Sequence, residues 1–210
     1  MNKELRYFSG GLSVRSVNGV SHLMGIACPY ERVSRNLGGF RERVKRGAFR
    51  SVLDANGDTF ALVNHNQEQV LGRTSSGTLQ LRETDDGLAF DIALPNTQLG
   101  QDVSEMCTRG DLRECSYGFV CGEDVWGDED VLDEDTNERC KSSVRNILSF
   151  RSLTDVSLVY SPANFGTGVK VVRSLFVGAI PAQVQAHMTD DSKEFEARRA
   201  RMAKRQKFLL

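Results

Sequence analysis

Residues 59–94, with the sequence TFALVNHNQEQVLGRTSSGTLQLRETDDGLAFDIAL, decide the fold class of this chain. Short apolar or alternating stretches are separated by clusters of Ser, Asp and Gly, which favour turns. Consecutive strands joined by such short turns form an antiparallel meander, so we expect a strand-rich fold. The pattern predicts strands at 59–65, 70–74, 78–82 and 88–94, and Pro95 ends the run.

The sequence on both sides of this meander adds further strands and two helices. The dipeptide Asn18-Gly19 lies between two apolar stretches and predicts a hairpin. Apolar residues at helical spacing precede Asn56-Gly57 and, further along, Gly110, which is typical of a helix end. We expect strands at 13–17, 20–27, 114–121, 144–150 and 154–160, helices at 47–54 and 97–109, and a loop at 28–42.

Two segments have compositions that predict little packed structure. Residues 122–138 are rich in Asp and Glu and have few side chains to bury, which predicts a solvated, mobile loop. Part of this loop resembles a calcium loop, but Glu138 and Val144 occupy the positions that need Gly and Glu. Residues 191–210 are charged and lack Gly and Pro, so we expect an exposed helix or a disordered tail that is separable from the core.

Composition limits the classes of function. A chain of 210 residues suits one large domain, or one domain with a flexible end. The net charge is -1 and the longest apolar runs are far short of a membrane span, so we expect neither nucleic acid nor a membrane as a partner. The five cysteines are irregularly spaced without a C-x-x-C pair, and there are three histidines. We therefore expect a reducing cytoplasm, no metal site and no cofactor.

Three side chains of complementary chemistry lie on or beside the predicted strands: His65, Ser116 and Asp155. These residue types can supply a hydroxyl nucleophile, its general base and a group that orients the base. Strand alternation puts Ser116 on one face with Gly118, while large side chains such as Tyr117 occupy the other. The pattern predicts that Ser116 faces an open surface, kept clear by Gly118, where a substrate could approach.

Each of these residues also has an ordinary structural interpretation. A strand serine can simply form a hydrogen bond, a histidine between two asparagines can occupy a surface turn, and an aspartate can end a strand. Of the other histidines, His22 lies within the hairpin and His187 in a polar C-terminal segment, so His65 is the best candidate base. Ser157 shares a strand face with Asp155 and could support its carboxylate by a hydrogen bond. The residues alone leave both interpretations open.

Seven short motifs between about residues 48 and 167 together resemble the prohead (capsid maturation) serine proteases of tailed bacteriophages. Each motif is weak alone, but their shared order makes the resemblance specific. The motifs are Asn64-His65-Asn66, Leu71-Gly72-Arg73, Gly77-Thr78-Leu79, Gly87-Leu88-Ala89-Phe90, Leu94-Pro95-Asn96-Thr97, Ser116-Tyr117-Gly118-Phe119, and Val156-Ser157-Leu158-Val159 with Pro162-Ala163.

The resemblance implies a β-rich α+β fold, with an antiparallel β-barrel and flanking helices like those of the herpesvirus maturation proteases. We expect a protease domain over 1–175 and a tail over 176–210, which is either a solvated segment without a role or a tether that is later removed by self-cleavage. The resemblance also implies Ser116 as nucleophile, His65 as general base and Asp155 as third catalytic member. Family members more often have a glutamate where this chain has Asp155.

The substrates implied by the resemblance are the phage capsid protein, the scaffold and the protease itself. The implied location is the assembling prohead in the host bacterial cytoplasm, and the sequence leaves a homo-oligomer open. Two alternatives belong to other classes: a non-catalytic capsid assembly or scaffolding protein on a protease fold, and an esterase using the same residues. A G-x-S-x-G motif is absent around Ser116, which disfavours an α/β-hydrolase.

Overall fold

The computed structural model describes residues 3–9, 12–133 and 137–160. The expected tail, 176–210, and the end of the expected 1–175 domain lie outside the described residues. The elements in chain order are β1 (Glu4–Ser9), β2 (Ser13–Val17), β3 (Val20–Pro29), β4 (Arg41–Val44), α1 (Arg50–Asp54), β5 (Phe60–Val63), β6 (Asn66–Arg73), β7 (Leu79–Glu83), β8 (Gly87–Ala93), α2 (Gln98–Arg109), β9 (Glu114–Cys121), β10 (Asp124–Asp133), β11 (Glu138–Ile147) and β12 (Phe150–Val159).

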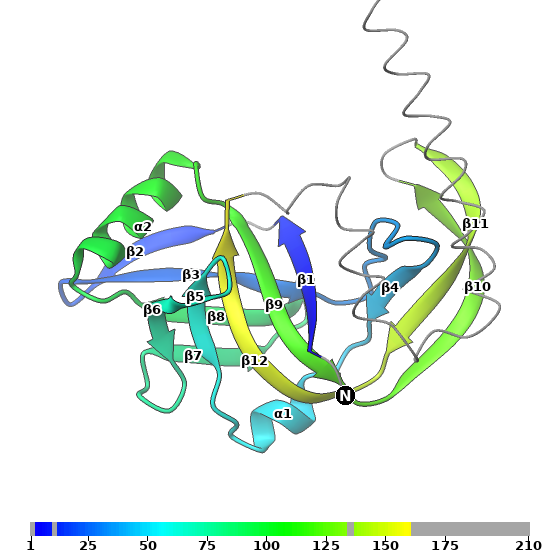
Figure 1. Cartoon of the computed structure of the whole chain (residues 1–210), viewed down its shortest axis with the longest axis horizontal. Helices are drawn as coiled ribbons and strands as arrows, with labels where there is room; N and C mark the ends of the chain where they lie inside the picture. The colour runs from blue at the N-terminus through cyan, green and yellow to red at the C-terminus, as the bar shows by residue number, and fades with distance from the viewer. Residues whose placement is uncertain (1–2, 10–11, 134–136, 161–210) are drawn as a thin grey trace, which may run out of the picture.

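The strands form three sheets, which can be followed in Figure 1. A five-stranded sheet has the order β1-β9-β12-β5-β6, a four-stranded sheet the order β2-β3-β8-β7, and a three-stranded sheet the order β10-β11-β4. Two neighbouring pairs are parallel, β12 with β5 and β11 with β4, and the other pairs are antiparallel. The β-rich α+β fold is confirmed. The expected closed barrel is not: within the described ranges, hydrogen bonds link the strands into three separate sheets, each with two edge strands.

Both expected helices are present. The longer one, α2, begins after Thr97, whose side chain accepts a hydrogen bond from the Gly100 backbone N–H, and ends at Gly110. Gly110 has a φ of 83°, a left-handed conformation that glycine adopts without steric cost. The short helix α1 covers one end of the five-stranded sheet and contacts β12 and β7.

The core contains an aromatic cluster on the face of β9 opposite Ser116. Tyr117 and Phe119 on β9 pack against Phe150, which stacks on Phe49 with ring centroids 4.2 Å apart. Phe49 and Phe119 are fully buried. Truncating a buried aromatic side chain of this kind typically costs about 3–5 kcal/mol, so this cluster fixes the face that β9 turns to the core.

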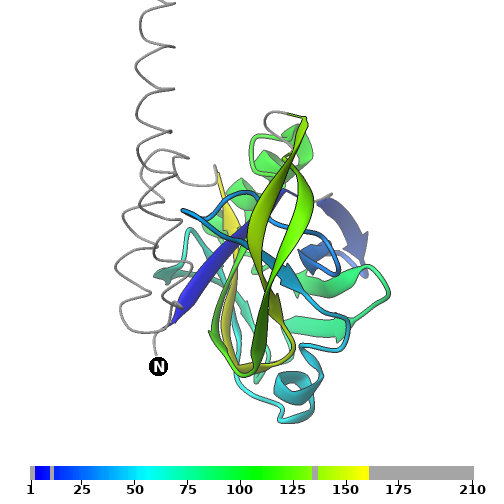
Figure 2. The same cartoon turned by 90° about the vertical axis from the view of Figure 1, so that its right-hand side faces the viewer.

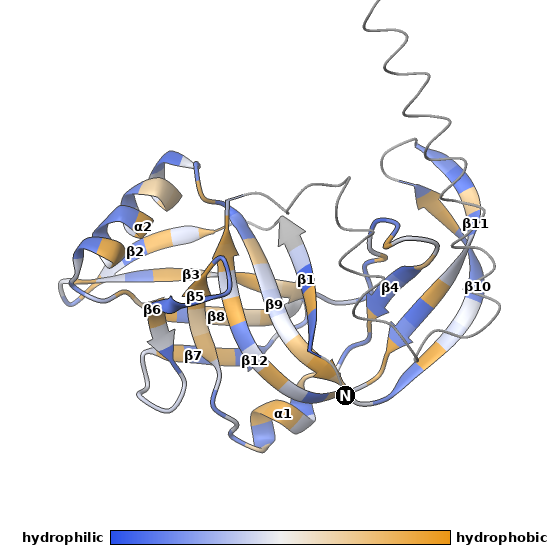
Figure 3. Ribbon diagram, in the orientation of Figure 1, coloured by the Kyte–Doolittle hydropathy of each residue, from blue (hydrophilic) through white to orange (hydrophobic). Residues whose placement is uncertain are grey.

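The acidic segment 122–138 is not the solvated loop that its composition predicts. From residue 124 onward it belongs to the hairpin of β10 and β11, paired from Asp124↔Ile147 to Asp133↔Glu138, with residues 134–136 outside the described residues. The hairpin is a twisted ribbon (Figure 2) whose far end is mostly hydrophilic (Figure 3). Its carboxylates have distant partners: Arg41 binds Asp133 at 2.8 Å, and Arg43 binds Glu129 at 2.8 Å.

Those two arginines come from β4, whose first two residues lie in the segment expected to be a loop, 28–42. Residues 28–42 do contain irregular structure, but Arg41–Val44 form a strand that pairs in parallel with β11. The apolar periodicity that identifies a strand is missing here, because the sequence Arg-Glu-Arg-Val is mostly charged. Two of its three charged side chains are nevertheless buried: Arg41 and Glu42 are each 3% exposed.

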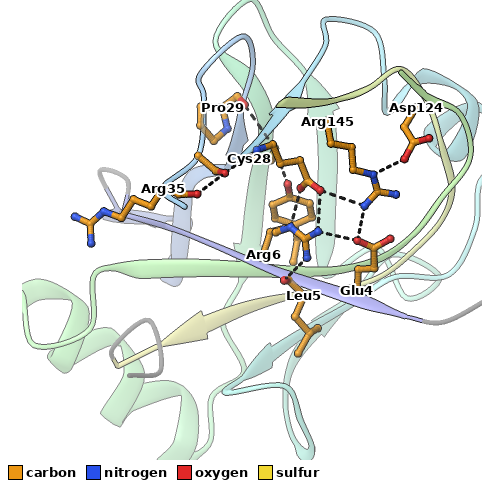
Figure 4. Close-up of polar contacts among 11 residues, drawn as sticks. Glu4, Leu5, Arg6, Cys28, Pro29, Arg35, Asp124 and Arg145 are labelled. Carbon is orange, nitrogen blue, oxygen red and sulfur yellow. Dashed lines mark hydrogen bonds and ion pairs between the residues drawn. The ribbon is translucent and has the colours of Figure 1, made fainter. Parts of the chain in front are cut away.

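Buried charges join β1, β4 and β11 in one network, drawn in Figure 4. Arg6 donates to both carboxylate oxygens of Glu42 at 2.7 Å and to Glu4 at 2.7 Å. Arg145 donates to Glu4 at 2.7 Å and to Glu42 at 3.3 Å, and forms an ion pair with Asp124. Burial disfavours the charged guanidinium, but Glu42 and Glu4 raise the pKa of Arg6 above its usual value. The network therefore holds β1 to the rest of the molecule through ion pairs inside the protein.

Candidate active site

The five-stranded sheet brings His65, Ser116 and Asp155 together. Ser116 lies on β9 and Asp155 on β12, the strand next to it, while His65 lies in the turn between β5 and β6 on the far side of β12. Ser116 is directly opposite Ser157 in the β9–β12 ladder, and Asp155 is opposite Phe60 in the β12–β5 ladder. Residues distant in the sequence thus meet on one face of three neighbouring strands.

The turn that carries His65 is tighter than the sequence predicts. The expected strand 59–65 ends at Val63, which pairs with Asn66, so Asn64 and His65 form a two-residue hairpin loop. Both have positive φ, 50° and 57°, the backbone of the turn that suits two-residue hairpins. The Asn64 N–H donates to the Leu158 carbonyl at 2.8 Å. This bond fixes the turn against β12 and places the imidazole beside it.

The three side chains form a continuous hydrogen-bonded chain. His65 Nε2 lies 2.5 Å from Ser116 Oγ, and His65 Nδ1 is hydrogen-bonded to Asp155 Oδ2. When Nδ1 carries the proton that it donates to Asp155, Nε2 has a free lone pair for the Ser116 hydroxyl. The predicted support from Ser157 is also seen, because its hydroxyl donates to Asp155 Oδ2 at 2.8 Å.

The Asp155 carboxylate is buried, yet its surroundings favour the ionised form over the protonated form. Its side chain is 2% exposed, and burial alone would raise its pKa. Hydrogen bonds from His65, Lys3 and Ser157 act in the opposite direction and hold the pKa of Asp155 well below its usual range. Such an arrangement can orient an imidazole and stabilise its protonated form, which is the electrostatic requirement for a general base beside a serine.

Comparison with known proteins identifies the family of this chain. The model of one family, described as caudovirus prohead serine protease, matches residues 11–177. The chain belongs to this family. The structure is also similar to a solved structure of the bacteriophage T4 capsid assembly protease, gp21, with 10% identity and a TM-score of 0.47, over 76% of this chain and 98% of that chain. No curated protein matches the sequence.

In this member of the prohead serine protease family, Ser116 is not on an open surface. The prediction from Gly118 was wrong, because Ser116 is 0% exposed and the space above Gly118 is filled. A Cβ atom added at Gly118 would lie 2.4 Å from Lys3 Cε and 2.5 Å from Asp155 Oδ1. Gly118 therefore makes room for the side chain of Lys3, not for a substrate.

Strand β1 and the residue before it supply two residues of the site that the sequence reasoning missed. Tyr7 is opposite Ser116 in the β1–β9 ladder, and its ring meets the His65 ring edge-on, with centroids 6.0 Å apart. Lys3 binds Asp155 Oδ1 at 2.6 Å. Neither residue lies in a motif, and the sequence signal that could have found them is weak, because both lie more than a hundred residues from their partners on β9 and β12.

A groove begins beside the buried carboxylate. It has a volume of about 880 Å³, and both Lys3 and Asp155 line it, together with the apolar side chains of Phe60, Leu62 and Leu81. Ser116 does not line this groove. Of the three residues in the hydrogen-bonded chain, only Asp155 lines the groove.

The structure of the described residues does not support a cysteine nucleophile at Cys115 or a metal site. Cys115, next to Ser116, is fully buried in the core, and burial raises the pKa of its thiol. Among residues 3–9, 12–133 and 137–160, no group of three or more His, Cys, Asp or Glu side chains could hold a metal ion. In the same part of the chain, no helix is both long enough and apolar enough to cross a membrane.

Proposed function

We propose that this protein is a serine endopeptidase in which Ser116 is the nucleophile, His65 the general base and Asp155 the orienting carboxylate. The observation that carries the proposal is the unbroken chain of hydrogen bonds from Ser116 Oγ through both imidazole nitrogens to Asp155. The family membership supports the same reaction class. A serine, a base and an oriented carboxylate in this order of contact constitute an activated nucleophile.

In this mechanism, Ser116 Oγ attacks the carbonyl carbon of a peptide bond while its proton passes to His65 Nε2. The imidazolium is stabilised by Asp155 and then protonates the leaving amine as the carbon–nitrogen bond breaks. A water molecule, deprotonated by the same nitrogen, hydrolyses the resulting acyl-enzyme and restores the Ser116 hydroxyl. Asp155 stays ionised throughout, as its lowered pKa requires.

The proposed substrates are proteins of the immature phage capsid: the major capsid protein, the scaffold and the protease itself. The family description places related proteins in the prohead, and we propose that this chain acts inside that shell in the host cytoplasm. We further propose that residues 1–175 form the catalytic domain and that residues 176–210 form a tail, which tethers the protease to the shell and is later removed by Ser116.

One observation favours the second candidate, a non-catalytic assembly protein on a protease fold. Ser116 is fully buried, so a substrate cannot reach its hydroxyl in the conformation described here. The two candidate functions differ in whether Ser116 becomes accessible to a substrate. A nucleophile that opens to substrate will also react with a small fluorophosphonate, whereas a permanently covered serine will not.

The deciding experiment incubates the purified chain with capsid and scaffold protein and identifies new termini by mass spectrometry. We expect cleavage by the wild type and by Ser142→Ala, a control on the β11 hairpin strand, and none by Ser116→Ala. Loss of a serine nucleophile costs on the order of a millionfold in known hydrolases. Cleavage by a folded Ser116→Ala protein would refute the assignment. A wild type that neither cleaves nor takes up fluorophosphonate would instead establish the non-catalytic role.

A further inference from the structure

The Asp155 carboxylate has two strong partners, one on each oxygen. His65 Nδ1 is hydrogen-bonded to Oδ2, and the Lys3 ammonium group lies 2.6 Å from Oδ1. The hydroxyl of Thr154 lies 3.0 Å from Oδ1 as well. The carboxylate is therefore held from both sides, and rotation about its Cβ–Cγ bond would break contacts at both oxygens.

The position of Lys3 is set by the backbone, not by chance contact of two surface side chains. Strand β1 pairs with β9 from Glu4↔Phe119 to Ser9↔Glu114, which puts Lys3 just beyond the end of the ladder, over Gly118. Thr154 donates to the Gly118 carbonyl at 2.9 Å and closes the other side of this space. Lys3 passes through a gap that exists because residue 118 has no side chain.

We propose that Lys3 is a positioning residue of the reaction: its ammonium group fixes Oδ1 of Asp155, so that Oδ2 stays directed at His65 Nδ1. The proposal rests on the proposed function, because it assigns a role within that catalytic chain. Lys3 acts through Asp155 and has no contact with Ser116 or with the reacting atoms.

Charge balance gives the physical reason. While His65 is neutral, Asp155 is a buried anion, and a buried anion is costly without a cation nearby. Lys3 supplies that cation in the resting state, with its own side chain 40% exposed and in contact with water. The titratable groups that face Asp155 are His65 from the β5–β6 turn, Lys3 just before β1, and Tyr7 on β1. Of these, Lys3 is the group that balances the charge of Asp155 while His65 is neutral.

The test compares neutral and conservative replacements of Lys3 with a matched control. Lys3→Met keeps the length and removes the charge, Lys3→Gln is a second neutral variant, and Lys3→Arg keeps the charge. The control is Lys45→Met, because Lys45 makes a 2.6 Å ion pair with Glu31 and is 37% exposed, similar to Lys3. We expect kcat to fall about 10- to 100-fold in the neutral Lys3 variants with little change in KM. We expect near wild-type kcat in Lys3→Arg and Lys45→Met.

A second readout does not depend on activity. In a Ser116→Ala background, the proton between His65 Nδ1 and Asp155 should give a downfield NMR signal, which a His65→Ala variant would assign by its loss. We expect this signal to move or broaden in the neutral Lys3 variants and to stay unchanged in Lys45→Met. Thermal unfolding of each variant separates these effects from loss of fold.

The two readouts distinguish failure of this proposal from failure of the proposed function. A wild type that cleaves, with unchanged kcat or an unchanged NMR signal in both neutral Lys3 variants, would overturn the role of Lys3 and leave the endopeptidase intact. A wild type that does not cleave would overturn the proposed function. In that case, movement of the NMR signal would still support a Lys3–Asp155–His65 coupling.

Discussion

Replacing Glu42 by glutamine should destabilise the protein far more than the same change at a comparable surface ion pair. Glu42 is 3% exposed and accepts hydrogen bonds from Arg6 at 2.7 Å on each oxygen and from Arg145 at 3.3 Å. Glutamine has nearly the same shape, so Glu42→Gln removes the negative charge and one acceptor without leaving a cavity. Two buried guanidinium groups then lose part of the charge that compensates their burial.

The loss of unfolding free energy in Glu42→Gln depends on the interactions that the two arginines keep. Breaking a buried ion pair by removing one partner costs about 3–5 kcal/mol. Here Glu4 still binds both arginines, and the glutamine oxygen still accepts one hydrogen bond, so the loss should be near the lower end, about 3 kcal/mol. For a domain of this size, about 3 kcal/mol corresponds to a Tm decrease of roughly 6–12 °C.

The control is Glu129→Gln on β10. Glu129 also receives two hydrogen bonds from one arginine, Arg43, at 3.0 and 2.8 Å, but its side chain is 35% exposed. An exposed pair contributes up to about 1 kcal/mol, so the Tm should fall by less than about 4 °C. Urea unfolding at pH 7 and thermal unfolding measure both variants. Equal losses in the two variants, or a Glu42→Gln protein as stable as the wild type, would refute the reasoning from burial.

Four further predictions concern the site and the tail. Asp155→Asn should lower kcat about ten-thousandfold while the chain stays folded, and retention of more than about a tenth of the activity would place the orienting group elsewhere. The pKa of Asp155 is lowered on folding, so its carboxylate contributes stability above its ordinary value near 4; the difference in unfolding free energy between wild type and Asp155→Asn should shrink as pH falls below about 4. Burial raises the pKa of Cys107 and Cys121 to about 11, so brief thiol alkylation at neutral pH should leave activity intact. If Ser116→Ala were active and alkylation inactivated both it and the wild type, the nucleophile would be a cysteine. Intact-mass measurement over time should show loss of a fragment from residues 176–210 in the wild type and none in Ser116→Ala; a wild type that cuts capsid protein but keeps its full mass would contradict self-removal.

Local signals in the sequence predicted the elements that depend on local physics. The helix before Gly110 and the hairpin around Asn18-Gly19 formed as expected, because capping and turn residues act within a few positions. The residue types of the site and their order were also readable, and the structure brings His65, Ser116 and Asp155 into contact. Their catalytic roles stay a prediction until the variants above are measured.

Pairings between distant segments were not readable in the same way. Strand β10 and the first part of β11 are rich in charged side chains, so periodicity gave no strand signal between residues 122 and 143, and the arginines that pair with the β10 carboxylates lie on β4. A barrel closes only when its edge strands pair with each other, and that pairing depends on the whole fold and not on local sequence. The sequence therefore did not show that the sheets stay open. Lys3 was missed for the same reason, since its contact with Asp155 spans 152 positions.

The place of β12 in its sheet also determines when the proposed active site can form during synthesis. β12 lies between β9 and β5, and those two strands have no ladder with each other in the described part of the chain. A ribosome therefore completes the strands bearing Ser116 and the turn bearing His65 before it makes the strand that aligns them. Non-local strand insertion of this kind is a late folding event. A nascent chain that ends before residue 150 should not hold Ser116 and His65 in line, so the proposed active site can form only after β12 has been made and inserted.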